Sequence, residues 1–167
     1  MSDPTAAKSA SALAVEHSTT ALDTALKRRA ELRETSRELV RALEAASPGR
    51  EGEWMTRVAA RLADLREDIL EHIVTTEAVD GLYDEIRADQ PRLQRQVNRL
   101  IADHEVLRDR VEACHALATR DGGAPDPIIV KAVRDEATAL MALMQRHRQR
   151  GSDLIFEAYE TDIGGAD

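Results

Sequence analysis

Aromatic residues are scarce in this chain, which has one Trp, one Phe and two Tyr among 167 residues. β-Sheets are built from runs of aromatic and β-branched residues that alternate with polar ones between turns. The few Val and Ile residues recur instead at the spacings of helices. The sequence therefore predicts an all-α fold.

Three further absences narrow the class of protein. The only cysteine, Cys114, cannot form an intramolecular disulfide, and this is typical of a reducing compartment. The N-terminal residues lack the basic and apolar regions of a signal peptide, and no run approaches the roughly 18 apolar residues of a membrane helix. The net charge of −8 disfavours nucleic-acid binding, which needs clustered Lys and Arg. We therefore expect a cytoplasmic protein with no membrane or nucleic-acid partner.

What the chain does contain is Ala, Leu, Arg and Glu in abundance, the composition of long helices. Pro and Gly residues gather at three places, which predicts four helices joined by short connections. The breaks lie at residues 47–49, 89–91 and 121–127, and the expected helices run from Ala6 to Ala46, Glu51 to Ala88, Pro91 to Arg120 and Pro127 to about Tyr159. Short connections favour an antiparallel up-down-up-down four-helix bundle. We expect one domain over residues 1–167, with disordered ends at 1–6 and 162–167.

The last three predicted helices each carry an apolar stripe that is interrupted by one histidine. The interruptions are His72, His104 and His147, and the stripe around the first of them continues through Val79, Tyr83 and Ile86. A buried imidazole nitrogen without a partner costs on the order of 1–3 kcal/mol. Each of these histidines therefore needs a hydrogen bond or a metal ion.

The fourth candidate histidine, His17, lies at the border of the apolar stripe of the first helix. It faces the bundle interior only if that helix presents a wide face there. Counting residues from the breaks brings His104 and His147 to similar heights. With straight helices, His72 and His104 would differ in height by about 9 Å.

One histidine per helix, with the segments Glu16-His17, Glu71 to Glu77 and Asp103-His104-Glu105, resembles the hemerythrin-like (HHE cation-binding) family. The resemblance implies a four-helix bundle with two iron ions at its centre, held by histidines and bridged by carboxylates. It also implies binding or sensing of dioxygen, iron storage, or handling of reactive oxygen and nitrogen species such as nitric oxide. The family's histidine ligands would correspond to His17, His72, His104 and His147.

The chain departs from this family at the bridging carboxylates. Thr76 and Gly151 stand where the bridging acids are expected. Two closely spaced iron ions need anionic ligands to offset their charge. Asp68 and Glu77 could supply that charge, as ligands or as acceptors that orient the imidazoles. The predicted metal-site residues are His17, His72, His104, His147, Glu77 and Asp68. A mononuclear iron or zinc site is the simpler alternative.

Three classes of function fit these features. The first is a metal-binding protein with iron, or zinc, that binds or senses dioxygen or a related diatomic. The second is a metal-free helical interaction module that has lost the di-iron site. The third is an enzyme, an iron-dependent oxidase or peroxidase, whose chemistry would depend on the metal because the sequence has no phosphate loop or dinucleotide motif. The length of the first helix would also allow it to pair with a second copy as a homodimer.

Overall fold

A computed structural model of the protein describes residues 4–45, 49–120 and 126–159, with side chains from residue 21 onward. Four long helices make up most of it: α1 (Pro4–Glu44), α2 (Glu51–Glu77), α4 (Gln94–Ala118) and α5 (Pro127–Tyr159). The short helix α3 (Leu82–Asp89) and the 3-10 turn η1 (Pro91–Leu93) join α2 to α4. No strand occurs among these residues, so the prediction of an all-helical fold with four long helices is confirmed.

The predicted disordered tail at 162–167 lies outside the described residues. Of the predicted disordered start, only the part from Pro4, where α1 begins, is described. Within the described part of the chain, no helix combines the length and the apolar character needed to cross a membrane.

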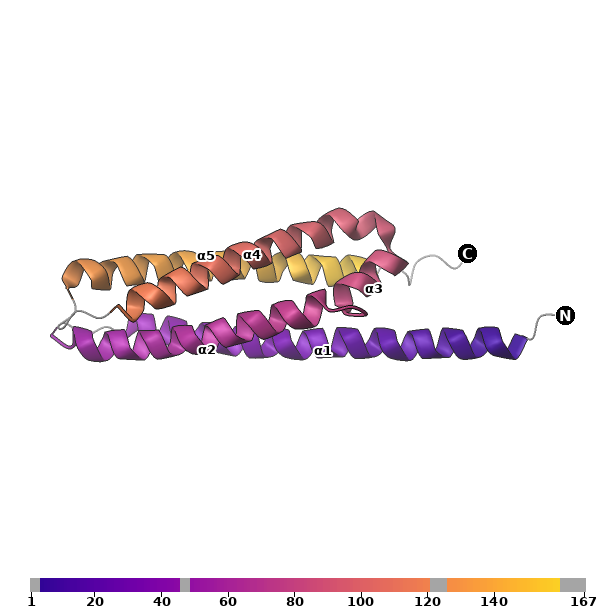
Figure 1. The fold of residues 1–167 in the computed structure, drawn as a ribbon, viewed down its shortest axis with the longest axis horizontal. Coiled ribbons are helices and arrows are strands. Elements are labelled where there is room, and N and C mark those ends of the chain that lie inside the picture. The colour runs from indigo at the N-terminus through magenta and orange to yellow at the C-terminus, as the bar shows by residue number, and fades with distance from the viewer. Residues whose placement is uncertain (1–3, 46–48, 121–125, 160–167) are drawn as a thin grey trace.

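The four long helices lie side by side along a common axis (Figure 1). α1 contacts α2, α2 contacts α4, and α4 contacts α5, whereas α1 and α5 meet at few residues. The C-terminal end of α1 and the start of α2 lie at one end of the molecule, and α3 lies toward the other end. The N-terminal part of α1 projects beyond the remaining helices.

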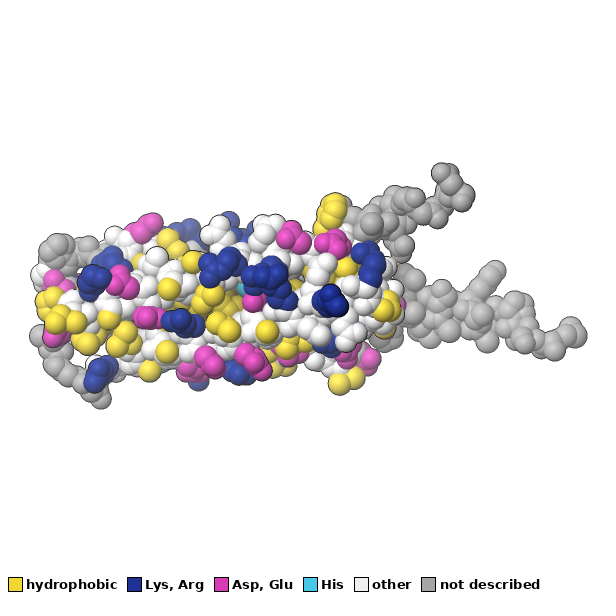
Figure 2. All heavy atoms as spheres, turned by 90° about the horizontal axis from the view of Figure 1, so that it is seen from above, with side chains coloured by type: hydrophobic (Ala, Val, Ile, Leu, Met, Phe, Trp, Pro, Cys, Tyr) yellow, Lys and Arg dark blue, Asp and Glu magenta, His cyan; other side chains and the backbone are white. Residues whose placement is uncertain are grey.

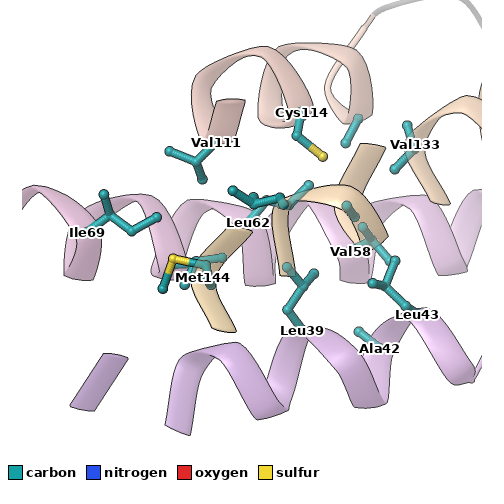
Figure 3. Close-up of a cluster of buried hydrophobic side chains, with 14 of the residues drawn as sticks. Leu39, Ala42, Leu43, Val58, Leu62, Ile69, Val111, Cys114, Val133 and Met144 are labelled. Atoms are coloured by element: carbon teal, nitrogen blue, oxygen red, sulfur yellow. The ribbon is translucent and has the colours of Figure 1, made fainter. Parts of the chain in front are cut away.

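The buried apolar side chains form two clusters along this axis. The larger cluster includes Leu39, Leu62, Val111 and Met144, from all four long helices (Figure 3). The smaller one includes Tyr83, Ile86, Leu93, Val97 and Leu154, near α3 and η1. Cys114 is a buried member of the larger cluster.

On the surface, one face carries Lys and Arg side chains near its middle, with hydrophobic side chains exposed beside them (Figure 2).

The predicted continuous helix from Glu51 to Ala88 is wrong. α2 ends at Glu77, and the chain turns before α3 begins at Leu82. Within the turn, Asp80 has a φ of 60°, in the left-handed region. A Cβ atom on Gly81 would lie 2.8 Å from the carbonyl oxygen of Ala78 and 2.9 Å from that of Thr75. Only glycine fits this close backbone approach.

Because of this turn, one residue that was predicted to lie in the buried apolar stripe is exposed instead. Val79 is 85% exposed, because it lies in the turn between α2 and α3. Tyr83 and Ile86 are buried as predicted, but from a separate helix.

Replacing Gly81 by alanine should therefore destabilise the fold. The added Cβ meets two backbone oxygens that cannot rotate away, so we expect a loss of about 1–3 kcal/mol in the free energy of unfolding. Urea unfolding followed by circular dichroism measures it. The matched control is Gly52→Ala, at an exposed position of α2, where alanine should cause no loss. Equal stability of the Gly81→Ala variant and the unmodified protein would contradict this account of the turn.

Candidate metal site

Three histidines from three helices converge at the boundary between the two apolar clusters. His72 on α2, His104 on α4 and His147 on α5 are all buried, with 5%, 2% and 5% of their surface exposed. One ring nitrogen from each lies within 4.8 Å of the other two. The Nε2 atoms of His72 and His147 are 3.2 Å apart. The histidines that interrupt the apolar stripes therefore do face one another.

His104 is held in place by contacts from both sides of the α2–α3 turn. Its Nδ1 lies 2.5 Å from Oε1 of Glu77, the last residue of α2. The Tyr83 ring, on α3, stacks on the imidazole at a centroid distance of 5.7 Å, with its hydroxyl 3.5 Å from Nε2. Since the carboxylate can only accept, we assign the proton of neutral His104 to Nδ1. Nε2 is then an acceptor that can receive a hydrogen bond from the Tyr83 hydroxyl or bind a metal ion.

In the described part of the chain, the other two histidines have no comparable contact at their outer ring nitrogens, the Nδ1 atoms. The Nδ1 atoms of His72 and His147 are buried and have no hydrogen-bond partner among the described residues. The nearest carboxylate to His147 Nδ1 is Asp103, whose Oδ2 lies 3.7 Å away, beyond hydrogen-bond range. Arg150 holds Asp103 in place, with Nη1 2.6 Å from both carboxylate oxygens. The layer formed by the three histidines thus contains buried imidazole nitrogens without a hydrogen-bond partner among the described residues.

Burial keeps all three imidazoles neutral near pH 7. Desolvation lowers the pKa of His104 to about 4, although the Asp103 carboxylate opposes the shift. Desolvation and the neighbouring His104 lower the pKa of His147, and Asp103 again opposes the shift. Desolvation and both neighbouring histidines lower the pKa of His72 well below its usual range. Neutral imidazoles are the form that binds a metal ion, so the three buried histidines can hold one.

The remaining predicted site residues lie in different places. Glu77 contacts the outer nitrogen of His104 and so supports a histidine without belonging to the group of three. Asp68 is half-buried on α2 outside the group of three histidines, and burial raises the pKa of its carboxyl group. The side chain of His17 lies outside the described residues, although its backbone belongs to α1.

The two positions that lack the expected carboxylates have their own contacts. The buried Thr76 hydroxyl donates to the backbone oxygen of His72 at 2.8 Å. At Gly151, the Arg29 guanidinium covers the Cα, and a Cβ there would lie 3.3 Å from Nη1. The Arg29 Nη2 donates to the Arg148 carbonyl at 3.0 Å and to Ser152 Oγ at 2.7 Å. A cation therefore lies where the resemblance led us to expect an anion.

A cavity of about 370 Å³ between α1 and α5 reaches this cluster. His72, His147, Thr76 and Tyr83 contribute to its wall, whereas His104 does not. The cavity gives a small molecule access to two of the three histidines.

The fold and the site define a helical protein with a buried cluster of histidines that can bind a metal ion. No protein-family model matches the chain, and neither the search of curated proteins nor the search of solved structures found a match.

The buried histidines should make the metal-free protein sensitive to acid. Their pKa values are lower in the folded than in the unfolded chain, so between about pH 6.5 and 4 the unfolded chain binds more protons. The free energy of unfolding should therefore fall as the pH is lowered through this window. The decrease should be up to about 1.4 kcal/mol per pH unit for each histidine that gains its proton on unfolding.

Urea unfolding of chelator-treated protein at pH 7.0, 6.0 and 5.0 measures this slope. The His147→Leu variant should have a shallower slope. The His115→Gln variant is the control, because His115 is half-buried outside the cluster. A stability that stays constant from pH 7 to 5 would contradict burial of neutral imidazoles.

Proposed function

We propose that this protein is a hemerythrin-like metal-binding protein with an antiparallel up-down-up-down bundle, in which His72, His104 and His147 hold a metal ion. The observation that carries the proposal is the convergence of three buried, neutral imidazoles from three helices. The side-by-side helices and the position of their ends in Figure 1 support the bundle arrangement. The family membership rests on the sequence resemblance alone.

The spacing of the imidazoles fits a single ion. Nitrogen ligands at about 2.0–2.1 Å from a tetrahedral ion lie about 3.3 Å from one another. The Nε2 atoms of His72 and His147 are already 3.2 Å apart, and the nitrogen of His104 is within 4.8 Å of both. A small ring movement of His104 completes the set. The contact of His104 with Glu77 is the carboxylate–imidazole arrangement that orients ligands at metal sites.

A single ion is favoured over a di-iron centre by the charges around the site. No carboxylate belongs to the described group of three histidines. Thr76 is neutral, and Arg29 covers Gly151 with positive charge. Two adjacent iron ions without anionic bridges would repel each other and Arg29. We therefore propose a mononuclear site for iron or zinc.

Three histidine ligands would leave a coordination position for a small molecule. An iron ion held here would supply affinity for dioxygen or nitric oxide. The chain's own residues would orient the ligands through Glu77, limit access of water by burial, and admit a small molecule through the cavity beside His72 and His147.

Metal analysis tests the proposal directly. Protein purified without added metal, and protein reconstituted anaerobically with Fe²⁺ or with Zn²⁺, should contain about one ion per chain by elemental analysis. Compared with chelator-treated protein, the reconstituted protein should have a higher thermal unfolding temperature, because free metal at 100 times the Kd stabilises the folded state by about 2.7 kcal/mol. His72→Ala should lose the ion, and His115→Gln should keep it. The absence of both bound metal and stabilisation would refute the metal site.

A second candidate, a metal-free interaction module, is favoured by one observation. The 3.2 Å between the Nε2 atoms of His72 and His147 is also a hydrogen-bond distance, and His104 already bonds to Glu77. The three histidines can therefore form hydrogen bonds with one another and with Glu77 without a metal ion.

The His104→Leu variant separates the two candidates. In a metal-free module, leucine fills the apolar boundary and leaves Glu77 in contact with solvent, so stability should be equal or higher with or without metal. In a metal-binding protein, the variant should lose the stabilisation that Fe²⁺ or Zn²⁺ gives the unmodified protein. The unfolding temperatures of the unmodified protein and of the His104→Leu variant, each measured with metal and with chelator, decide between the two functions.

A further inference from the structure

The cavity between α1 and α5 has a charge of one sign. Its lining includes five arginines and no aspartate or glutamate, although the protein as a whole has a net charge of −8. The five are Arg29, Arg33, Arg37, Arg41 and Arg148. A cationic lining in an acidic protein points to a ligand that carries negative charge.

Three of these arginines keep their charge unbalanced. Arg37 and Arg41 lie 3.3 and 3.5 Å from carboxylate oxygens of Glu34. Arg29, Arg33 and Arg148, in contrast, form no ion pair with any described residue. The hydrogen bonds of Arg29 go to neutral acceptors, the Arg148 carbonyl and the Ser152 hydroxyl.

Arg33 and Arg148 line the same cavity as Arg29 and lie close enough to it to repel its charge. Burial is the main cause that lowers the pKa of Arg29, and repulsion from Arg33 and Arg148 lowers it further. An anion bound among them would relieve this repulsion. Guanidinium groups pair with carboxylates through two parallel hydrogen bonds, which makes a carboxylate a good match for the cluster.

Apolar side chains form a large part of the remaining lining. Leu32, Val40, Met141, Met144, Leu154 and Ile155 all contribute to its lining. Its volume of about 370 Å³ lies in the range of small-molecule sites, which span roughly 300–1,000 Å³. Methionine side chains adapt to ligands of different shape. A hydrophilic anion would leave this apolar surface unused, whereas an apolar chain with a charged end matches both parts.

We propose that this cavity binds a small amphipathic carboxylate, with its carboxylate between Arg29, Arg33 and Arg148 and its apolar chain along the leucine and methionine side chains. The ligand class is that of medium-chain fatty acids. The arginines and apolar residues proposed to hold this ligand are not among the three histidines, although His72 and His147 line the same cavity. It adds a second ligand to a protein whose proposed function so far concerns a metal ion.

Isothermal titration calorimetry of the chelator-treated full chain with sodium decanoate tests the proposal. Binding should be saturable at one decanoate per chain. Decan-1-ol has the same chain without the charge, and we expect it to bind at least about tenfold more weakly, because it cannot form charge-assisted hydrogen bonds with the guanidinium groups. Acetate, which has the charge without the chain, should give no measurable binding. Absence of saturable decanoate binding, or equal binding of decanol, would overturn the proposal.

Matched variants locate the site. Arg33→Gln should weaken decanoate binding by about fivefold or more, and Ile155→Trp should weaken it by filling the apolar part of the cavity. The control Arg57→Gln removes an exposed arginine outside the lining and should leave the affinity unchanged. Equal losses in the Arg33 and Arg57 variants would show general charge attraction and would overturn the assignment.

The His104→Leu variant separates this proposal from the metal site. His104 does not line the cavity, so this variant should bind decanoate like the unmodified protein even where it loses the metal. Loss of decanoate binding in this variant, with its unfolding temperature unchanged, would show that the two sites are not separate.

Discussion

The burial of three imidazoles in one layer is the constraint on which the rest of this structure depends. Apolar clusters lie on both sides of the layer, so its polar nitrogens have little access to water. Each nitrogen needs a hydrogen bond or a metal ion, or it lowers stability by about as much as a lost buried hydrogen bond. His104 has such partners in Glu77 and Tyr83, whereas the outer nitrogens of His72 and His147 have none among the described residues. These two Nδ1 atoms lack partners among those residues whether or not a metal ion binds the Nε2 atoms, so they are the least stabilised polar groups of the layer.

The turn at Gly81 connects the fold to this layer. A continuous helix would carry Glu77 and Tyr83 along one straight axis. The turn instead ends α2 at Glu77, so that its carboxylate contacts one edge of His104, and begins α3 in a position from which Tyr83 stacks on the ring. It also changes the path between His72 and His104, which straight helices would have left at different heights. A backbone feature with no polar side chain of its own thus determines how the histidines meet.

The four long helices and the inward-facing His72, His104 and His147 could be predicted from the sequence, because both follow from a periodicity of three and four residues. The turn at Gly81 could not be found in this way, since a single glycine within a helical pattern is usually tolerated. Arg29 and Asp103 were also missed as parts of the site. Arg29 approaches Gly151 from a helix more than a hundred residues away, and Asp103 approaches His147 from α4. Contacts of this kind depend on how helices are placed, which their individual patterns do not contain. Asp68 had the right spacing to His72, but its carboxylate does not belong to the group of three histidines.

Arg29 links the two sites that we propose. Its guanidinium covers Gly151, where the family resemblance led us to expect a carboxylate, and its charge contributes to the low pKa of His72 and His147. The same guanidinium lines the cavity together with Arg33 and Arg148. A positive charge at this point disfavours a second cation in the histidine layer and favours an anion in the cavity beside it. The positive charge of Arg29 therefore has two consequences with one electrostatic cause. It restricts the histidine layer to few positive charges, and it prepares the neighbouring cavity for a negatively charged ligand.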